Sequence, residues 1–406
     1  MLESFRARLR SYPLTTIELA LTVMLWQAST GVFLLSIVQQ YLPQELEANA
    51  AFPGYALAIY AAGRFLLQAP AGWLADRLGR RRTLTLGIAV SLPSIFLMLQ
   101  VQDAHSFLAF SALYGAGSAA IWPAIMAYVG DTHDASTRGR TLHALNLSQL
   151  AGLGIGTMAG VTLLDLISYQ AAFAACLTFS ALALAFAYRG ARISTRSGPK
   201  EATEKLPIDL RGIFSVRLLL LAAIALTLSI GTTVQAPVIG TYTSDVLDTK
   251  IHVLGLMILA PAAVAAVIAV RFGHVADRFG RHIPLITGLT VASLCYFLLS
   301  QTSNPLLAVN LVVLAGLAYA ISIPAWGAAA LDATEIGGRG LVIGMLATVQ
   351  GLGGITGQAV GGLASAAWGP LAPFKVGAIL LSVAVVLTVM HFHQHERAAA
   401  RLRAEA

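Results

Sequence analysis

Long apolar runs alternate with short polar segments along almost the whole chain. Each run holds about 20 residues, the length that an α-helix needs to cross a lipid bilayer. The polar segments between them are mostly short enough to be loops. The pattern therefore predicts twelve membrane-spanning helices, at roughly residues 14–40, 54–75, 83–101, 106–130, 142–164, 169–188, 216–241, 252–272, 284–301, 306–331, 341–367 and 373–392.

The composition and the placement of charge support this interpretation. Hydrophobic residues make up 57% of the 406 residues and charged residues only 11%, against about 25% charged in soluble domains, which excludes a soluble globule. Of the 26 lysines and arginines, all but Arg64, Lys250 and Lys375 fall in segments that would share one side of the membrane. Basic residues beside spans are retained in the cytoplasm. We therefore expect both termini to be cytoplasmic, and the net charge of +7 calls for no nucleic-acid partner.

The two halves of the chain repeat each other at a constant offset of 201 residues. The offset superposes glycine, proline, aspartate and arginine positions, such as Gly72 on Gly273 and Pro123 on Pro324. Six predicted spans lie on each side of the polar segment 190–215, so both copies have the same orientation in the membrane, which is the parallel-repeat plan of secondary transporters.

This repeat predicts the fold class and the domains. We expect an all-α membrane protein whose two six-helix bundles are related by a pseudo-two-fold axis along the membrane normal. The N-terminal bundle covers residues 1–189, a cytoplasmic linker covers 190–215, and the C-terminal bundle with a short cytoplasmic tail covers 216–406.

The loop after the second predicted helix carries a family motif. GWLADRLGRRR at residues 72–82 resembles the signature loop of the major facilitator superfamily, and GHVADRFGRH at residues 273–282 resembles a degenerate second copy. In motif style the chain is closest to members that export drugs and other organic solutes. The resemblance implies the superfamily fold and a conformational latch, in which Asp76 contacts the end of the eleventh helix and Arg80 pairs with Asp131; the alternative is that these charges only fix the topology. The residues assigned to the latch in both copies are Gly72, Asp76, Arg77, Gly79, Arg80, Asp131, Gly273, Asp277, Arg278, Gly280, Arg281 and Asp332.

Glycines in this loop and in two of the helices have expected structural roles. Gly72 would allow close approach of a neighbouring helix, and Gly79 would allow a left-handed turn at the end of the second helix. Glycines at every fourth position form a ridge in the fifth helix and another in the eleventh, and we expect these to be packing surfaces. The ridges comprise Gly152, Gly156, Gly160, Gly353, Gly357 and Gly361.

The coupling mechanism is less clearly marked. Residues 353–362 resemble the glycine-rich signature of the superfamily's antiporters, but Gln358 stands where that signature has a proline. Ser111 stands where drug/proton antiporters of the superfamily usually have an arginine. Glu18 is the acid that lies well inside a predicted span, which makes it the candidate for proton coupling; the alternative is an acid placed near the N-terminal dipole of its helix.

Arg64 is the basic residue predicted deepest in the membrane. An arginine at that depth costs at least about 2.5–3.5 kcal/mol on insertion scales and needs a compensating partner. Tyr60 and Gln68 lie one turn to either side of it, and other polar and aromatic residues fall on helices that line the central cavity in the superfamily; each could instead be interhelical packing. The candidate substrate-binding residues are Trp26, Gln27, Tyr60, Arg64, Gln68, Tyr114, Trp122, Gln235, Tyr319 and Trp326.

The remaining chemistry-bearing residues predict no cofactor and no metal site. Cys176 and Cys295 both lie in apolar runs and are expected to be small core residues. His391, His393 and His395 follow the last predicted span, and we expect them to belong to a solvated tail.

These observations predict a secondary active transporter that moves a small amphipathic organic solute by alternating access, most simply by efflux, with proton antiport as an option. The principal alternative is uptake or facilitated transport of an organic anion that uses Arg64. A membrane enzyme is disfavoured because no cluster of acids, histidines or cysteines is evident, and a sensor without transport is disfavoured because the linker between the halves is short. The expected partners are the solute, the lipid bilayer and, for antiport, protons, and the protein is expected to be a monomer in a bacterial-type inner membrane.

Overall fold

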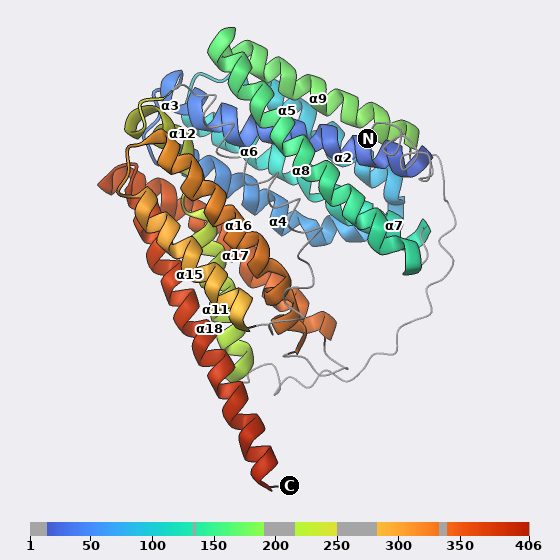
Figure 1. The fold of residues 1–406 in the computed structure, drawn as a ribbon. Helices are drawn as coiled ribbons and strands as arrows, with labels where there is room; N and C mark the ends of the chain where they lie inside the picture. The colour runs from blue at the N-terminus through green and yellow to red at the C-terminus, as the bar shows by residue number, and fades with distance from the viewer. Residues whose placement is uncertain (1–13, 133–134, 191–215, 250–281, 333–338, 406) are drawn as a thin grey trace, which may run out of the picture. The chain divides into compact units, whose positions relative to one another are not determined.

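The computed structural model describes residues 14–132, 135–190, 216–249, 282–332 and 339–405. The chain forms two compact units, residues 1–202 and residues 203–406. Within the described ranges the regular secondary structure is helical, and Figure 1 shows its elements.

The first unit consists of long helices joined by short connections. Its first helix continues from α-helical into π-helical geometry before ending in a short α-helical turn. The elements are α2 (Leu14–Val32), η1 (Phe33–Tyr41), α3 (Leu42–Gln44), α4 (Phe52–Leu78), α5 (Arg80–Met98), α6 (Ala104–Ala119), α7 (Ile121–Thr132), α8 (Ala135–Leu166) and α9 (Tyr169–Gly190).

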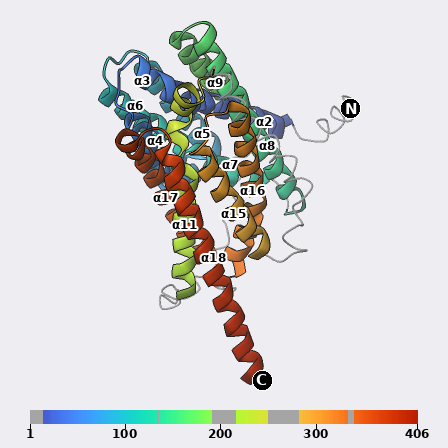
Figure 2. The same cartoon turned by 60° about the vertical axis from the view of Figure 1, so that its left-hand side comes forward.

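The second unit has the same character, but its first helix is broken. The elements are α11 (Val216–Thr233), η2 (Ala236–Val238), α12 (Ile239–Thr241), η3 (Tyr242–Val246), α15 (His282–Leu299), α16 (Pro305–Asp332), α17 (Arg339–Trp368) and α18 (Ala372–Glu405). Figures 1 and 2 show the C-terminal part of α18 extending beyond the other helices of this unit.

Apart from the span predicted at 252–272, which lies outside the described residues, the predicted spans agree with these helices, with two differences. The fourth predicted span is divided into α6 and α7, and the seventh is interrupted after α11, where Pro237 lacks the backbone N–H that a continuous helix needs. Eight helical segments of the described chain are long and apolar enough to cross a membrane. Three other helices are less apolar. Helix α4 carries Arg64, α5 begins with three arginines, and α17 contains many glycines.

The last helix corrects one expectation. The sequence predicts that His391 belongs to a solvated tail, but the helix of the last span runs on to Glu405, and His391 is buried and packs edge-on against the ring of Phe392. Both cysteines are free and buried, as the apolar runs around them predict.

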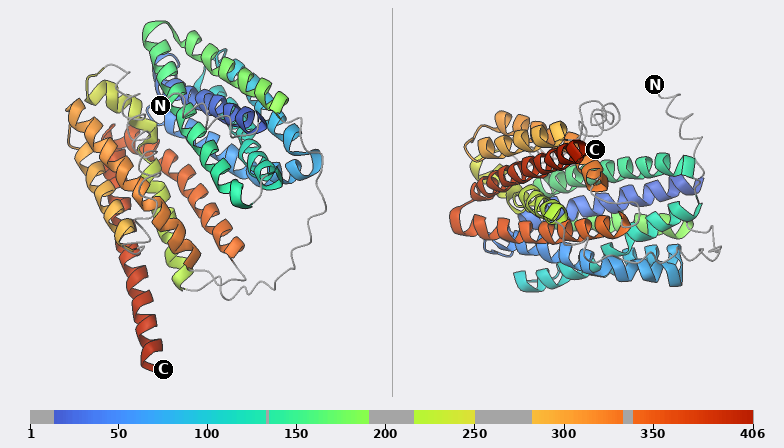
Figure 3. Two further views of the ribbon diagram at one scale, coloured as in Figure 1. Left: turned by 45° about the vertical axis from the view of Figure 1, so that its right-hand side comes forward. Right: turned by 90° about the horizontal axis from the view of Figure 1, so that it is seen from below.

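The two glycine ridges are packing surfaces, as predicted. In the first unit α2 packs against α8 and α9, and Figures 1 and 3 show these helices side by side. A Cβ atom added at Gly156 would fall 1.8 Å from the backbone oxygen of Ala28. In the second unit a Cβ at Gly361 would fall 1.9 Å from the backbone oxygen of Val234. Because no side chain larger than hydrogen fits at such distances, each ridge lets two helix backbones touch.

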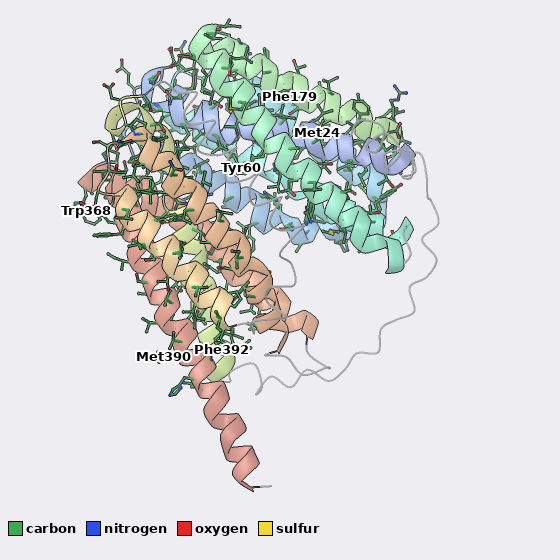
Figure 4. The ribbon with its side chains drawn as sticks, in the orientation of Figure 1. Met24, Tyr60, Phe179, Trp368, Met390 and Phe392 are labelled. Atoms are coloured by element: carbon green, nitrogen blue, oxygen red, sulfur yellow. The ribbon has the colours of Figure 1, made fainter. Side chains whose placement is uncertain are left out.

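Aromatic side chains fill the interior of the first unit. Phe33 and Tyr114 are fully buried, and their ring centroids are 4.7 Å apart in an edge-on arrangement. The ring centre of Tyr60 lies 5.5 Å from that of Tyr114, and the ring centre of Phe107 lies 6.3 Å from that of Phe33. Figure 4 shows Tyr60 on α4. These rings pack η1, α4 and α6 against one another.

Candidate functional site

The loop between α4 and α5 is closed by a glycine in an unusual conformation. Gly79 has φ of 91° and ψ of 150°, so the positive φ that the sequence predicts is present. Its ψ places it in the extended region open to glycine alone rather than in a left-handed helical turn. This residue reverses the chain between the two helices and brings the first turn of α5 beside the last turn of α4.

Gly72 does not have the role expected of it. A Cβ atom at this position would lie 3.8 Å from the Cβ of Pro123, which is ordinary van der Waals contact. The expectation that a close helix approach requires Gly72 is therefore wrong in this structure, because α4 and α7 leave room here for a methyl group.

Arg80 is the centre of a charge cluster at the loop between α4 and α5. Its Nε donates to Asp131 Oδ2 at 3.0 Å, and its Nη1 donates to Asp76 Oδ1. The pair with Asp131 joins α5 to α7 and is the contact that the family resemblance implies. Burial acts to lower the pKa of Arg80, but the hydrogen bonds and negative charges of the two carboxylates outweigh it and raise the pKa above its ordinary value. Arg80 is therefore charged throughout the physiological pH range.

Two neighbouring arginines make contacts with aromatic rings. The guanidinium of Arg81 lies 4.4 Å from the ring centre of Tyr188 and donates to its backbone oxygen at 2.6 Å, which ties α5 to the end of α9. Arg77 lies 4.2 Å above the ring of Trp73 on the same helix. Cation–π contacts of this kind hold both arginines beside the loop.

The second copy of the loop is largely outside the described part of the chain. Gly273, Asp277, Arg278, Gly280 and Arg281 lie in the range 250–281, and Asp332 is the last residue of α16. The latch function of either copy stays a prediction.

A small pocket of about 20 Å³ in the first unit gathers four of the candidate substrate-binding residues. Trp26 and Gln27 come from α2, Arg64 from α4, and Trp122 from α7. The other lining residues are Val23, Ser118, Ile121, Ile125 and Gln149. The pocket therefore has an aromatic and aliphatic wall, uncharged hydrogen-bonding groups and a single cation.

Arg64 is half-buried and has no hydrogen-bond or ion-pair partner among the residues that the structure describes. No aspartate or glutamate is among the residues that line the pocket in the described ranges. The donors of Arg64 are therefore available to water or to a ligand in the pocket.

Two further candidates lie behind this pocket rather than on its surface. Tyr114 is fully buried and is hydrogen-bonded through its hydroxyl to Ser29, at 3.2 Å. Its ring packs 5.5 Å from that of Trp26. The hydroxyl of Ser118, which lines the pocket, donates to the Tyr60 hydroxyl at 3.2 Å. Tyr60 and Tyr114 therefore hold the pocket wall in place.

A larger cavity in the second unit contains two more candidates. Gln235 and Tyr319 line a space of about 370 Å³ together with Tyr296, Thr232 and other residues of α11, α15, α16 and α18. Tyr296 and Thr232 were not identified from the sequence. Comparison of the two repeats at the 201-residue offset could have pointed to Tyr296, because it stands opposite Ile95 in an otherwise similar helix.

The remaining candidates lie elsewhere. Trp326 is half-buried and packs against the apolar core of the second unit, and Gln68 is half-buried on α4 one turn beyond Arg64. Glu18 is half-buried in the second turn of α2, where the Thr22 hydroxyl donates to its backbone oxygen at 2.8 Å. Whether these three residues take part in transport stays a prediction.

Two helical units with apolar spans, glycine-packed helix pairs and a motif repeated at a fixed offset define a membrane transporter of the duplicated type. The family model of the Major Facilitator Superfamily matches residues 19–242 and 221–406. The chain therefore belongs to this superfamily, as its signature loop indicates.

Similar proteins cover most of the chain. The proton-coupled antiporter flippase LtaA of Staphylococcus saprophyticus is 23% identical over 354 residues, which are 86% of either chain. The multidrug resistance protein MdtG of Enterobacter lignolyticus is 27% identical over 328 residues, covering 78% of this chain and 77% of that protein.

Solved structures of transporters share the fold. The nucleoside transporter NupG has a TM-score of 0.77 at 14% identity, over 94% of this chain and 99% of its own. The human organic anion transporter MFSD10 has a TM-score of 0.63 at 16% identity, over 93% of this chain and the whole of its own. These likenesses support the twelve-helix, two-bundle architecture that the sequence predicts.

Proposed function

We propose that this transporter exports a small amphipathic organic solute by alternating access, and that the solute binds in the pocket formed by Trp26, Gln27, Arg64 and Trp122. The observation that carries the proposal is the guanidinium of Arg64, which bonds to no residue in the described part of the chain and lies in a pocket with two tryptophans. Keeping an arginine on a membrane helix costs at least about 2.5–3.5 kcal/mol. A side chain that recovers none of this cost from the described residues around it is well suited to a ligand.

The pocket also limits the charge of the solute. The half-buried Trp122 offers an apolar face to a hydrophobic body, the largely buried Trp26 adds to the apolar lining, and Gln27 and Gln149 offer uncharged polar groups. Arg64 repels a cation, and no acid among the described lining residues offsets it. The pocket therefore favours a neutral or anionic amphipathic solute over a cationic one.

The direction and coupling of transport rest on the relatives. One similar protein is named as a proton-coupled antiporter flippase, which supports proton antiport, and another as a multidrug resistance protein, which supports efflux. Glu18 is our candidate for the coupling carboxylate because it lies inside a predicted span. The alternative is uptake of an organic anion, which the positive charge of Arg64 favours.

The charged loop would control access from the cytoplasm. In this proposal Asp76, Arg80 and Asp131, with Asp277 and its neighbours in the second copy, hold the cytoplasmic side closed during part of the cycle. The protein would act as a monomer in the bacterial inner membrane with both termini cytoplasmic.

Substitution of Arg64 tests the site. In proteoliposomes supplied with 4-fluorobenzoate, its neutral alcohol and its ammonium counterpart, Arg64→Lys should weaken apparent affinity for the carboxylate, because lysine keeps the charge but loses the planar fork. Arg64→Ala should weaken it further. Arg189→Ala, which removes an exposed arginine at the end of α9, is the matched control and should behave as the wild type.

Folding must be checked in the same preparations. Variants that keep the wild-type melting temperature but also keep the wild-type apparent affinity for every solute would show that Arg64 is a structural residue. That result would remove the pocket from the proposal.

A further inference from the structure

The break after α11 places an amide group beside a cavity. The helix ends at Thr233, and Gln235 follows directly before the short helix η2. The Gln235 Nε2 donates to the backbone oxygen of Thr232 at 2.6 Å and to the hydroxyl of Tyr296 at 2.7 Å. Discontinuous membrane helices of this kind often form transporter binding sites.

These contacts fix which way the amide points. A backbone oxygen can only accept a hydrogen bond, so the group 2.6 Å from the Thr232 oxygen must be the NH₂ of Gln235. The Oε1 atom therefore points away from it. It is buried, and no residue that the structure describes donates to it. Buried acceptors are rarely left without a donor, and this one belongs to a residue that lines the cavity of about 370 Å³.

Comparison of the two repeats shows why the cavity exists. At the 201-residue offset Tyr114 corresponds to Ala315, and Leu34 corresponds to Gln235. Tyr114 is one of the largest fully buried side chains of the first unit, whereas Ala315 lines the cavity of the second. The second unit therefore has a hollow where the first has a ring, and an amide where the first has an aliphatic side chain.

One aromatic contact beside the cavity is present in both repeats. Tyr41 packs edge-on against Phe173 in the first unit with ring centres 5.2 Å apart. Their counterparts at the same offset, Tyr242 and Phe374, are 4.7 Å apart in the second unit. This contact is kept although the first helix of the second unit is broken, so we connect the hollow with the smaller side chain of Ala315.

The lining defines the chemistry of a ligand. No charged residue is among the cavity residues in the described ranges. Gln235 Oε1 needs a donor, and the hydroxyl of Tyr296, which already accepts from Gln235, can donate its own hydrogen. A hydroxyl group satisfies both, because it donates and accepts at one atom. Apolar side chains such as Phe374 and Val312 surround these groups.

We propose that the C-terminal unit has a binding site between α11, α15, α16 and α18 for an uncharged amphipathic molecule, whose hydroxyl group donates to Gln235. The volume is at the lower end of the range for small-molecule sites. The site itself is independent of the Arg64 pocket. Only the further claim that the bound molecule is a transported solute rests on the proposed function.

Matched probes and repeat-swapping variants test the site. We would measure binding of 4-fluorobenzyl alcohol and of 4-fluorotoluene, which lacks the hydroxyl, to the full chain in nanodiscs by ¹⁹F NMR. Signals from protein-free nanodiscs correct for partition into lipid. Gln235→Leu gives the second repeat the residue of the first, and Ala315→Tyr restores the ring that fills the first.

We expect Gln235→Leu to weaken binding of the alcohol about tenfold, the usual effect of losing one buried hydrogen bond, and to leave 4-fluorotoluene unchanged. Ala315→Tyr should abolish binding of both probes. If Ala315→Tyr fails to fold, the smaller change Ala315→Leu narrows the same cavity and should weaken binding of both probes.

Two results would overturn the inference. One is that the alcohol and 4-fluorotoluene bind to the wild type with equal affinity and that Gln235→Leu changes neither affinity. The other is no saturable binding of either probe, which would mean that the cavity holds water alone. Neither result bears on the proposed function, which the Arg64 variants test separately. Binding of the alcohol together with unchanged transport in those variants would support the site and contradict the proposed function.

Discussion

The contact between α2 and α8 gives a sharp prediction about how rigid the first bundle is. A Cβ at Gly156 would lie 1.8 Å from the backbone oxygen of Ala28, whereas ordinary contact begins at 3.4 Å. Gly156→Ala must therefore separate two helix backbones by about 1.6 Å, the difference of these distances. Neither atom belongs to a flexible side chain that could move aside.

The expected cost follows from this geometry. An added methyl group in a packed interior usually lowers the free energy of unfolding by about 1–3 kcal/mol. We expect the upper end of this range because the new Cβ would clash with a backbone oxygen and not with a movable side chain. Gly72→Ala is the matched control. Its Cβ would lie 3.8 Å from Pro123, so the same added methyl should cost almost nothing.

The assay is thermal unfolding of both purified variants in one detergent, followed by tryptophan fluorescence. We expect Gly156→Ala to lower the melting temperature by about 5 °C or more and Gly72→Ala to match the wild type. Equal melting temperatures for the two variants would refute the reasoning, because they would show that α2 and α8 separate without cost.

Three further predictions concern the charged groups. Asp76→Asn should slow transport while leaving the melting temperature unchanged, and Asp277→Asn should have a smaller effect because its loop has fewer basic residues; wild-type rates in both would contradict a latch. Asp131→Asn should weaken the attachment of α7 to Arg80, read as faster hydrogen exchange in α7, whereas unchanged exchange would show that the ion pair contributes little. Glu18→Gln should abolish proton-driven accumulation but spare downhill exchange, and coupling that survives would place the coupling carboxylate elsewhere.

The sequence predicts the features that repeat. Apolar runs predict the helices because helix length must match bilayer thickness, and a fixed offset predicts that Gly156 and Gly357 pack in equivalent places. The pair of Arg80 with Asp131 follows from the family motif. Periodicity and motif are local properties, so a single sequence reveals them.

Properties that depend on packing are not visible in the same way. The position of Tyr114 in the sequence predicts that it lines a cavity, but its ring is fully buried in the interior of the first unit. Gln235 reads as an intramembrane polar residue, but the break of its helix and the direction of its amide depend on Thr232 and Tyr296. An alanine in an apolar run does not by itself indicate a cavity. Ala315 becomes informative only when the repeat offset pairs it with the much larger Tyr114.

Accumulation in inverted membrane vesicles tests the central claim, proton-driven export, most directly. Vesicles containing the full chain would receive radiolabelled 4-fluorobenzoate with an imposed proton gradient, with the gradient collapsed by an ionophore, and without the protein. Export predicts concentrative accumulation that requires both the protein and the gradient and is lost in Arg64→Ala. Concentrative accumulation in right-side-out vesicles alone would contradict it and would establish uptake instead.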